Sequence, residues 1–121
     1  MALRFNPETP LAGEIRVVEN ALIVPWGEGN HRKMARPAGV FDAQGNFCID
    51  AMTWRSSRRP TTVEPILPAE ADVDRTLSGT MLYAGLSYGH FGHALCESLA
   101  RLWAVDEFDG AIDAVAFIPK N

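Results

Sequence analysis

The hydrophobic pattern of the chain changes in kind about two thirds of the way along it. In residues 1–79, short apolar runs rich in β-branched residues alternate with polar stretches that carry glycine and proline. Runs of this length indicate strands and turns rather than helices. From residue 80 on, an apolar run (80–88) precedes a segment with helical periodicity and a second apolar run (114–118). The pattern therefore predicts a single domain over 1–121, with a β-hairpin-rich part followed by a βαβ unit over 80–121.

Within the first part, the stretch "VFDAQGNFCIDAMTWR" (40–55) carries the clearest turn signal. Two apolar runs flank Asp42–Asn46, and Gly45 can adopt the positive φ that tight turns need. This spacing predicts a β-hairpin.

The other segments of the first part give weaker signals. Residues 13–26 are rich in β-branched side chains and predict one or two strands, whereas residues 27–39 are polar and basic and predict a loop. Three prolines in residues 56–79 predict an extended connector across the surface.

In the βαβ unit, a turn at Gly89 and a helix from about Phe91 to Phe108 connect the two strands. The strands of such a unit are parallel and connected right-handedly, and parallel strands are normally buried on both faces. The sequence ends three residues after Ile118, before a second crossover helix that could cover the other face. The chain is therefore expected to be the front section of a larger α/β protein.

The predicted helix separates apolar from ionisable side chains. At about 100° per residue, one face is expected to pack on the sheet and the opposite face gathers the ionisable groups. The apolar face comprises Phe91, Leu95, Leu99, Leu102 and Trp103, and the ionisable face His90, His93, Glu97 and Arg101.

Several chemistries fit the ionisable face. It is an ordinary solvated surface if Glu97 and Arg101 merely form an i, i+4 ion pair. Histidine is a poor helix former, however, and the helix begins at the carboxyl end of a strand, where open α/β sheets bind ligands. His93 is then a candidate base near neutral pH, because the helix N-terminus lowers its pKa and Glu97 raises it. A metal held by His90, His93 and Glu97 is a further alternative, and Cys96 is expected to be a small core thiol.

The charge and composition of the chain restrict the kinds of partner that it could bind. The net charge of −4 argues against nucleic-acid binding. Residues 32–59 nevertheless hold six basic and two acidic side chains. Such a group is either a solvated surface or a patch that binds an anionic ligand or associates peripherally with a membrane. No signal-like or membrane-spanning run is present, and the two cysteines have no paired spacing, so we expect free thiols in a cytoplasmic protein.

A family resemblance enters at "YAGLSYGHFGHALCESLARLWAVDEF…AVAFIP". This stretch resembles the amino-terminal motif of bacterial glycosyltransferase family 61 proteins of the capsular polysaccharide biosynthesis type. The motif is a strand, a Gly-His-Phe-Gly-His turn, a helix with an acidic residue, and Leu-x-Arg-Leu-Trp. The resemblance covers about residues 35–119, because the 40–55 hairpin and the proline-bearing connector are similar too. The motif positions are Gly89, His90, Phe91, Gly92, His93, Glu97, Leu99, Arg101, Leu102 and Trp103.

The resemblance implies a GT-B architecture, of which this chain would be an incomplete Rossmann-like amino-terminal domain. It also implies inverting transfer of a sugar from a nucleotide sugar to a glycan acceptor, without a metal or other cofactor. The carboxyl-terminal, donor-binding half of the family pattern is missing, so the chain is expected to be inactive alone. In the inverting reaction His93 is expected to be the base, with Glu97 orienting it or acting directly. His90, Arg101, Tyr88 and Gly89 are expected to bind substrate.

Two function classes compete with the transferase. One is a non-catalytic module that binds a carbohydrate or a partner, with the apolar sheet edge as its interface; association of copies through the same edge is left open. The other is a small metal-dependent hydrolase that uses the face of His90, His93 and Glu97.

Overall fold

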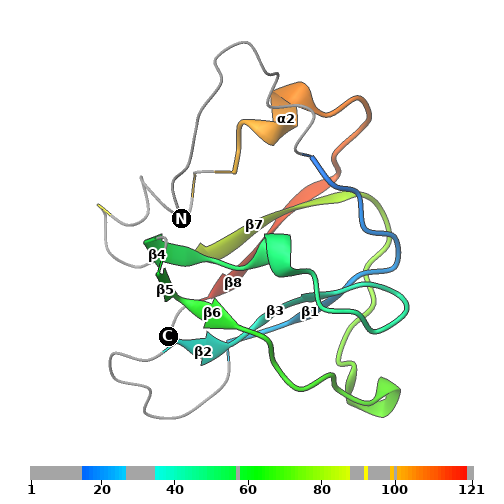
Figure 1. The fold of residues 1–121 in the computed structure, drawn as a ribbon. Coiled ribbons are helices and arrows are strands. Elements are labelled where there is room, and N and C mark those ends of the chain that lie inside the picture. Colours follow the sequence, from blue (N-terminus) through cyan, green and yellow to red (C-terminus); the bar gives the residue numbers. More distant parts are fainter. Residues whose placement is uncertain are drawn as a thin grey trace.

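The computed structural model describes residues 15–26, 35–56, 58–87, 92, 99 and 101–119, with the backbone alone given at Arg55 and Ser56. Within these ranges the strands form four two-stranded sheets, and the bounded helical segments are short (Figure 1). The prediction of mixed strands and helix is confirmed at this coarse level. Its finer part, a Rossmann-like domain of a GT-B enzyme, goes beyond the described sheets and stays a prediction.

The first part of the chain contributes three of the sheets. They are the antiparallel pair β1 (Leu22–Val24) and β3 (Gly39–Phe41), the parallel pair β2 (Arg36–Pro37) and β6 (Thr62–Val63), and the antiparallel pair β4 (Trp54–Ser56) and β5 (Arg59–Pro60). Two 3-10 turns, η2 (Ile49–Ala51) and η3 (Glu70–Asp72), complete this part. The prediction of one or two strands in 13–26 is confirmed by β1. The extended connector predicted for 56–79 contains β5, β6 and η3, which the prolines did not reveal.

The predicted hairpin at 40–55 is confirmed in its turn. Phe41 and Phe47 form an antiparallel bridge, and the Cys48 amide donates to the Val40 carbonyl at 2.8 Å. Asp42 closes the turn because its Oδ1 accepts the backbone amides of residues 44 and 46, both at 2.9 Å. Gly45 has a φ of 81°, the left-handed conformation that glycine adopts without steric cost.

The predicted parallel pair is also confirmed. β7 (Met81–Ser87) pairs in parallel with β8 (Ala114–Pro119), from Met81 opposite Ala114 to Ser87 opposite Pro119, with an irregularity between Tyr83 and Gly85. The connection between them ends in the short helix α2 (Ala104–Glu107), whose C-cap is Phe108, the residue at which the periodicity ended. Figure 1 shows β7 and β8 side by side in the middle of the molecule.

A small core joins the first part to the βαβ unit. Ala38, between β2 and β3, packs in one buried cluster with Leu86 of β7 and Ile118 of β8, each at most 2% exposed. The half-buried rings of Trp26 and Tyr83 lie against this cluster. Burial of apolar surface therefore fixes the end of the parallel pair against the short sheets.

The outer face of β8 is exposed in the described part of the chain. Val115 and Phe117 keep 39% and 38% of their surface accessible, whereas Ile118 is 2% exposed. An apolar parallel strand suits burial on both faces, but within the described residues one face of β8 stays exposed. Only the side carrying Ile118 has a described layer to pack against.

Candidate functional site

The motif that carries the family resemblance begins directly after β7. Five of the predicted site residues lie outside the described residues: Tyr88, Gly89, His90, His93 and Glu97. Gly92 is helical and exposed. The roles assigned to those five residues, and the alternative of a metal held by three of them, therefore stay predictions.

Arg101 is the one predicted site residue whose side chain is described. Its Nη2 donates to the main-chain carbonyls of Ala51 and Met52, at 3.3 and 3.1 Å. Its guanidinium carbon lies 5.4 Å from the centroid of the Tyr83 ring in β7, the geometry of a cation–π contact. The side chain is half-buried and contacts two segments of the protein, residues 51–52 and β7.

This position corrects the helical-wheel prediction for Arg101. The periodicity placed Arg101 opposite the sheet, whereas its guanidinium lies against β7. Leu99, predicted to face the sheet, is 44% exposed. The residues from Arg101 to Trp103 form a turn before α2 rather than a continuous helix, so a constant 100° step does not apply to them.

The backbone of β7 comes close to Arg101 at the irregularity in its pairing. Gly85 is buried and has a φ of +87°. A Cβ at this position would lie 3.4 Å from Thr53 Oγ1 and 3.5 Å from Arg101 Nη1. Thr53 Oγ1 is itself buried and has no hydrogen-bond partner among the described residues. Both distances are ordinary van der Waals contacts, so the positive φ, rather than lack of space, favours glycine here. Arg101, Thr53 and Tyr83 form a polar cluster beside this part of β7.

Burial sets the electrostatics of this cluster. Desolvation lowers the pKa of the Arg101 guanidinium, and the adjacent Tyr83 partly opposes that change. Desolvation raises the pKa of the Tyr83 phenol, and the charge of Arg101 partly opposes this in turn. A neutral phenol beneath a cation is therefore the stable state around neutral pH.

Sequence reasoning missed Tyr83, Thr53 and Gly85 as neighbours of Arg101. A glycine inside an apolar strand is a signal of a bulge or of a close approach by another group, and Gly85 carried that signal. The sequence did not reveal that the group lying next to Gly85 includes Thr53, which is more than thirty positions earlier in the chain.

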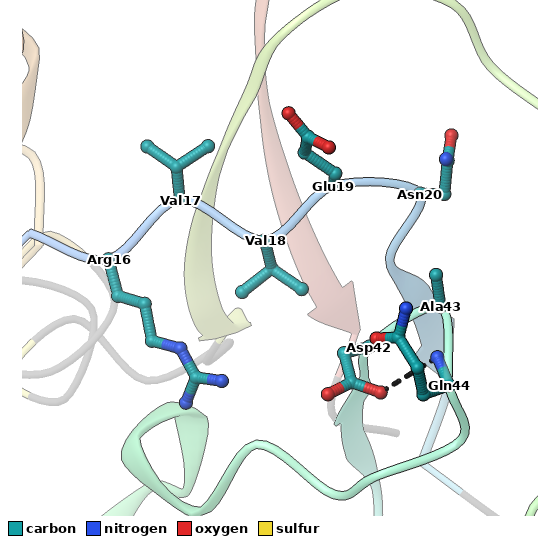
Figure 2. A pocket seen from close by; sticks show the side chains of 8 residues that line it. All are labelled: Arg16, Val17, Val18, Glu19, Asn20, Asp42, Ala43 and Gln44. Carbon is teal, nitrogen blue, oxygen red and sulfur yellow. Dashed lines mark hydrogen bonds between the residues drawn. The ribbon is translucent and has the colours of Figure 1, made fainter.

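A separate pocket lies between the segment before β1 and the hairpin turn (Figure 2). It has a volume of about 450 Å³ and is mostly polar in its side chains. Hydrogen bonds from the turn, above all from the Asn46 backbone amide, lower the pKa of Asp42 and so favour its carboxylate. Arg16 on the opposite wall pairs with Asp50 at 3.5 Å. The pocket is lined by Arg16, Val17, Val18, Glu19, Asn20, Asp42, Ala43 and Gln44.

The structure describes three of the six basic side chains of residues 32–59. The guanidinium carbon of Arg36 lies 4.9 Å from the Trp26 ring centroid, and Arg58 and Arg59 are exposed. Arg32 and Lys33 are outside the described residues. Cys48 is a buried free thiol whose pKa burial raises.

Among the described residues, no group of three or more His, Cys, Asp or Glu side chains has an arrangement that could hold a metal ion. No helix in the part of the chain that the structure describes has both the length and the apolar character needed to cross a bilayer.

Comparison with known proteins returned no match: no protein-family model, no curated protein and no solved structure is significantly similar to this chain. The resemblance to family 61 glycosyltransferases therefore depends on the motif residues themselves.

Proposed function

We propose that this chain is the acceptor-side portion of an inverting glycosyltransferase that builds a polysaccharide in the cytoplasm from a nucleotide sugar. The observation that carries the proposal is the parallel pair β7–β8, with the Gly-His-Phe-Gly-His motif starting just after the carboxyl end of β7. Open α/β sheets bind ligands at this edge. A donor-binding half of GT-B type would complete the enzyme.

In this proposal the motif supplies the base. His93, oriented by Glu97, takes the proton of the acceptor hydroxyl as its oxygen attacks the anomeric carbon of the donor. The bond between that carbon and the nucleotide phosphate breaks, and the phosphate leaves with the electron pair, so the anomeric configuration inverts. His90, Tyr88 and Gly89 would orient the substrates, and no metal or cofactor takes part.

The test is a turnover assay on the complete encoded protein with a panel of nucleotide sugars and glycan acceptors. Mass spectrometry would detect the elongated acceptor, and NMR would report the configuration of the new linkage. We expect His93→Ala to lower the turnover rate at least about a hundredfold, because general-base catalysis contributes about 10²–10⁴ in rate. His31→Ala, which removes the only histidine outside the motif, is the matched control and should keep wild-type turnover.

Two results would contradict the proposal. One is His93→Ala retaining full turnover, which would remove His93 from the mechanism. The other is a product that retains the donor's anomeric configuration.

A second candidate function is a non-catalytic carbohydrate-binding module. The pocket in Figure 2 favours it, because carboxylate, amide and guanidinium groups line one open space and can pair with sugar hydroxyls. Glycan-array binding that is lost in Gln44→Ala and unchanged in His93→Ala would select this function over the transferase. The hydrolase alternative would require a stoichiometric metal in the purified protein that is lost in His93→Ala.

A further inference from the structure

Arg101 connects parts of the chain that are far apart in sequence. Its two hydrogen bonds reach the carbonyls of Ala51 and Met52, fifty and forty-nine positions earlier, at the end of η2. Its ring contact is with Tyr83 of β7, at 5.4 Å. One side chain thus contacts both the first part of the chain and the βαβ unit.

The geometry of these contacts suits a guanidinium specifically. One terminal nitrogen donates to two adjacent carbonyls, and the planar group lies over an aromatic ring. A lysine ammonium could also donate to two carbonyls from one nitrogen, but it has no flat face to lie over the ring. The other terminal nitrogen lies beside Gly85 of β7, 3.5 Å from the position that a Cβ would take.

The contacts also satisfy a partly desolvated charge. Burying a cation is costly unless dipoles or a counter-charge replace its water. The described partners of Arg101 are protein carbonyls and an aromatic face. The carbonyl dipoles and the ring electrons compensate part of the charge, as structural partners would.

We infer that Arg101 is a positioning residue that fixes the end of the motif segment onto β7 and onto residues 51–53. This deepens the proposed function, on which the importance of the motif depends, and it replaces substrate binding as the role of Arg101.

Amide hydrogen exchange on the ligand-free chain tests this role, because residues 51–53 lie far from Arg101 in sequence. The Met52 amide donates to the Ile49 carbonyl, and the Thr53 amide to Thr62 Oγ1. Without the donors of Arg101, the carbonyls that order this segment lose their partners. We expect Arg101→Met to speed exchange of these two amides about tenfold or more.

Internal references make the measurement specific. The Asp42 and Cys48 amides, which bond within the hairpin, should exchange at wild-type rates in Arg101→Met. Arg75→Met removes an exposed arginine from a segment without regular structure and should change none of the four amides. If Arg101→Met does not fold, Arg101→Lys keeps the charge without the planar group and should show a smaller acceleration at the same two amides.

Two outcomes would overturn the inference. One is wild-type exchange of Met52 and Thr53 in both Arg101 variants. The other is thermal stabilisation of the wild-type protein by inorganic phosphate that disappears in Arg101→Lys, since the guanidinium would then be available to an anionic ligand. Neither measurement uses turnover, so a failed glycosyltransferase assay would leave this result standing, and the reverse also holds.

Discussion

The hairpin turn at residues 42–46 and the cluster around Arg101 stabilise the chain in opposite ways. In the turn, Asp42 bonds to amides two and four positions ahead, in an exposed place. Around Arg101, the partners are two carbonyls about fifty positions earlier in the chain and the Tyr83 ring of β7. These groups are half-buried. The turn can form from its own sequence, whereas the cluster forms only when the two parts of the chain pack together. Loss of the packing between the two parts should therefore disrupt the Arg101 cluster far more than the hairpin turn.

The largest expected effect comes from the core that joins the two parts. Leu86 is 1% exposed and packs with Ala38 and Ile118. We expect Leu86→Ala to lower the free energy of unfolding by about 3 kcal/mol, because it removes buried methyl groups and leaves a cavity. Urea denaturation followed by tryptophan fluorescence measures this.

The matched control is Leu77→Ala, since Leu77 is 60% exposed and should change the free energy of unfolding by less than about 0.5 kcal/mol. Equal effects of the two substitutions would mean that Leu86 does not lie in a core that joins the two parts.

The same contrast explains how much could be predicted from the sequence. Apolar runs and turn residues are local signals, and they predicted the turn at Asp42–Asn46, the pairing of β7 with β8 and the end of the helical segment at Phe108. The surroundings of Arg101 depend on which distant carbonyls and rings approach it. The helical wheel placed Arg101 on the wrong side because it assumes a regular helix through residues 101–103. The resemblance predicted roles for His93 and Glu97, which no described contact tests.

Two glycines with left-handed backbones, one in the hairpin turn and one beside Arg101, allow the two regions to be compared directly. Gly85 has a φ of +87° and Gly45 a φ of +81°. An alanine at either position is strained, by about 1–2 kcal/mol. At Gly85 the new methyl would make ordinary van der Waals contacts with Thr53 and Arg101, at 3.4 and 3.5 Å, but the backbone is buried and paired in β7, so the strain is hard to relieve. At Gly45 it would meet only the end of the Leu67 side chain, at 3.0 Å, which can move.

We therefore expect Gly85→Ala to be more destabilising than Gly45→Ala, by about 1 kcal/mol, in the same urea assay. The Arg101 amide-exchange signature at Met52 and Thr53 should appear in Gly85→Ala and be absent in Gly45→Ala. Equal destabilisation would show that the cluster tolerates a methyl group as easily as the turn does.

A comparable difference is expected between two threonines of the first part. Thr62 is 1% exposed, and its hydroxyl accepts the Thr53 amide at 2.9 Å, so Thr62→Val leaves that amide unpaired. We expect a loss of about 1–2 kcal/mol. Thr53→Val removes a hydroxyl that has no described partner and should be neutral or slightly stabilising. Differential scanning calorimetry would resolve the two, and a marked loss in Thr53→Val would reveal a partner for that hydroxyl.

The smallest effect concerns the turn alone. Hydrogen bonds from the Asn46 and Gln44 backbone amides hold the pKa of Asp42 below its ordinary value of 3.8. A lowered folded-state pKa means that the carboxylate contributes stability above about pH 4, and that this contribution is lost as the pH falls through the folded-state value. Asp42→Asn keeps the Oδ1 acceptor without the charge, so it should preserve the turn and reduce the acid sensitivity of unfolding. NMR titration of the Asp42 carboxyl carbon measures the shift, and a midpoint at or above 3.8 would contradict it. Because the turn is local, the exchange rates at Met52 and Thr53 should be the same in Asp42→Asn as in the wild type, which separates the turn from the Arg101 cluster in one experiment.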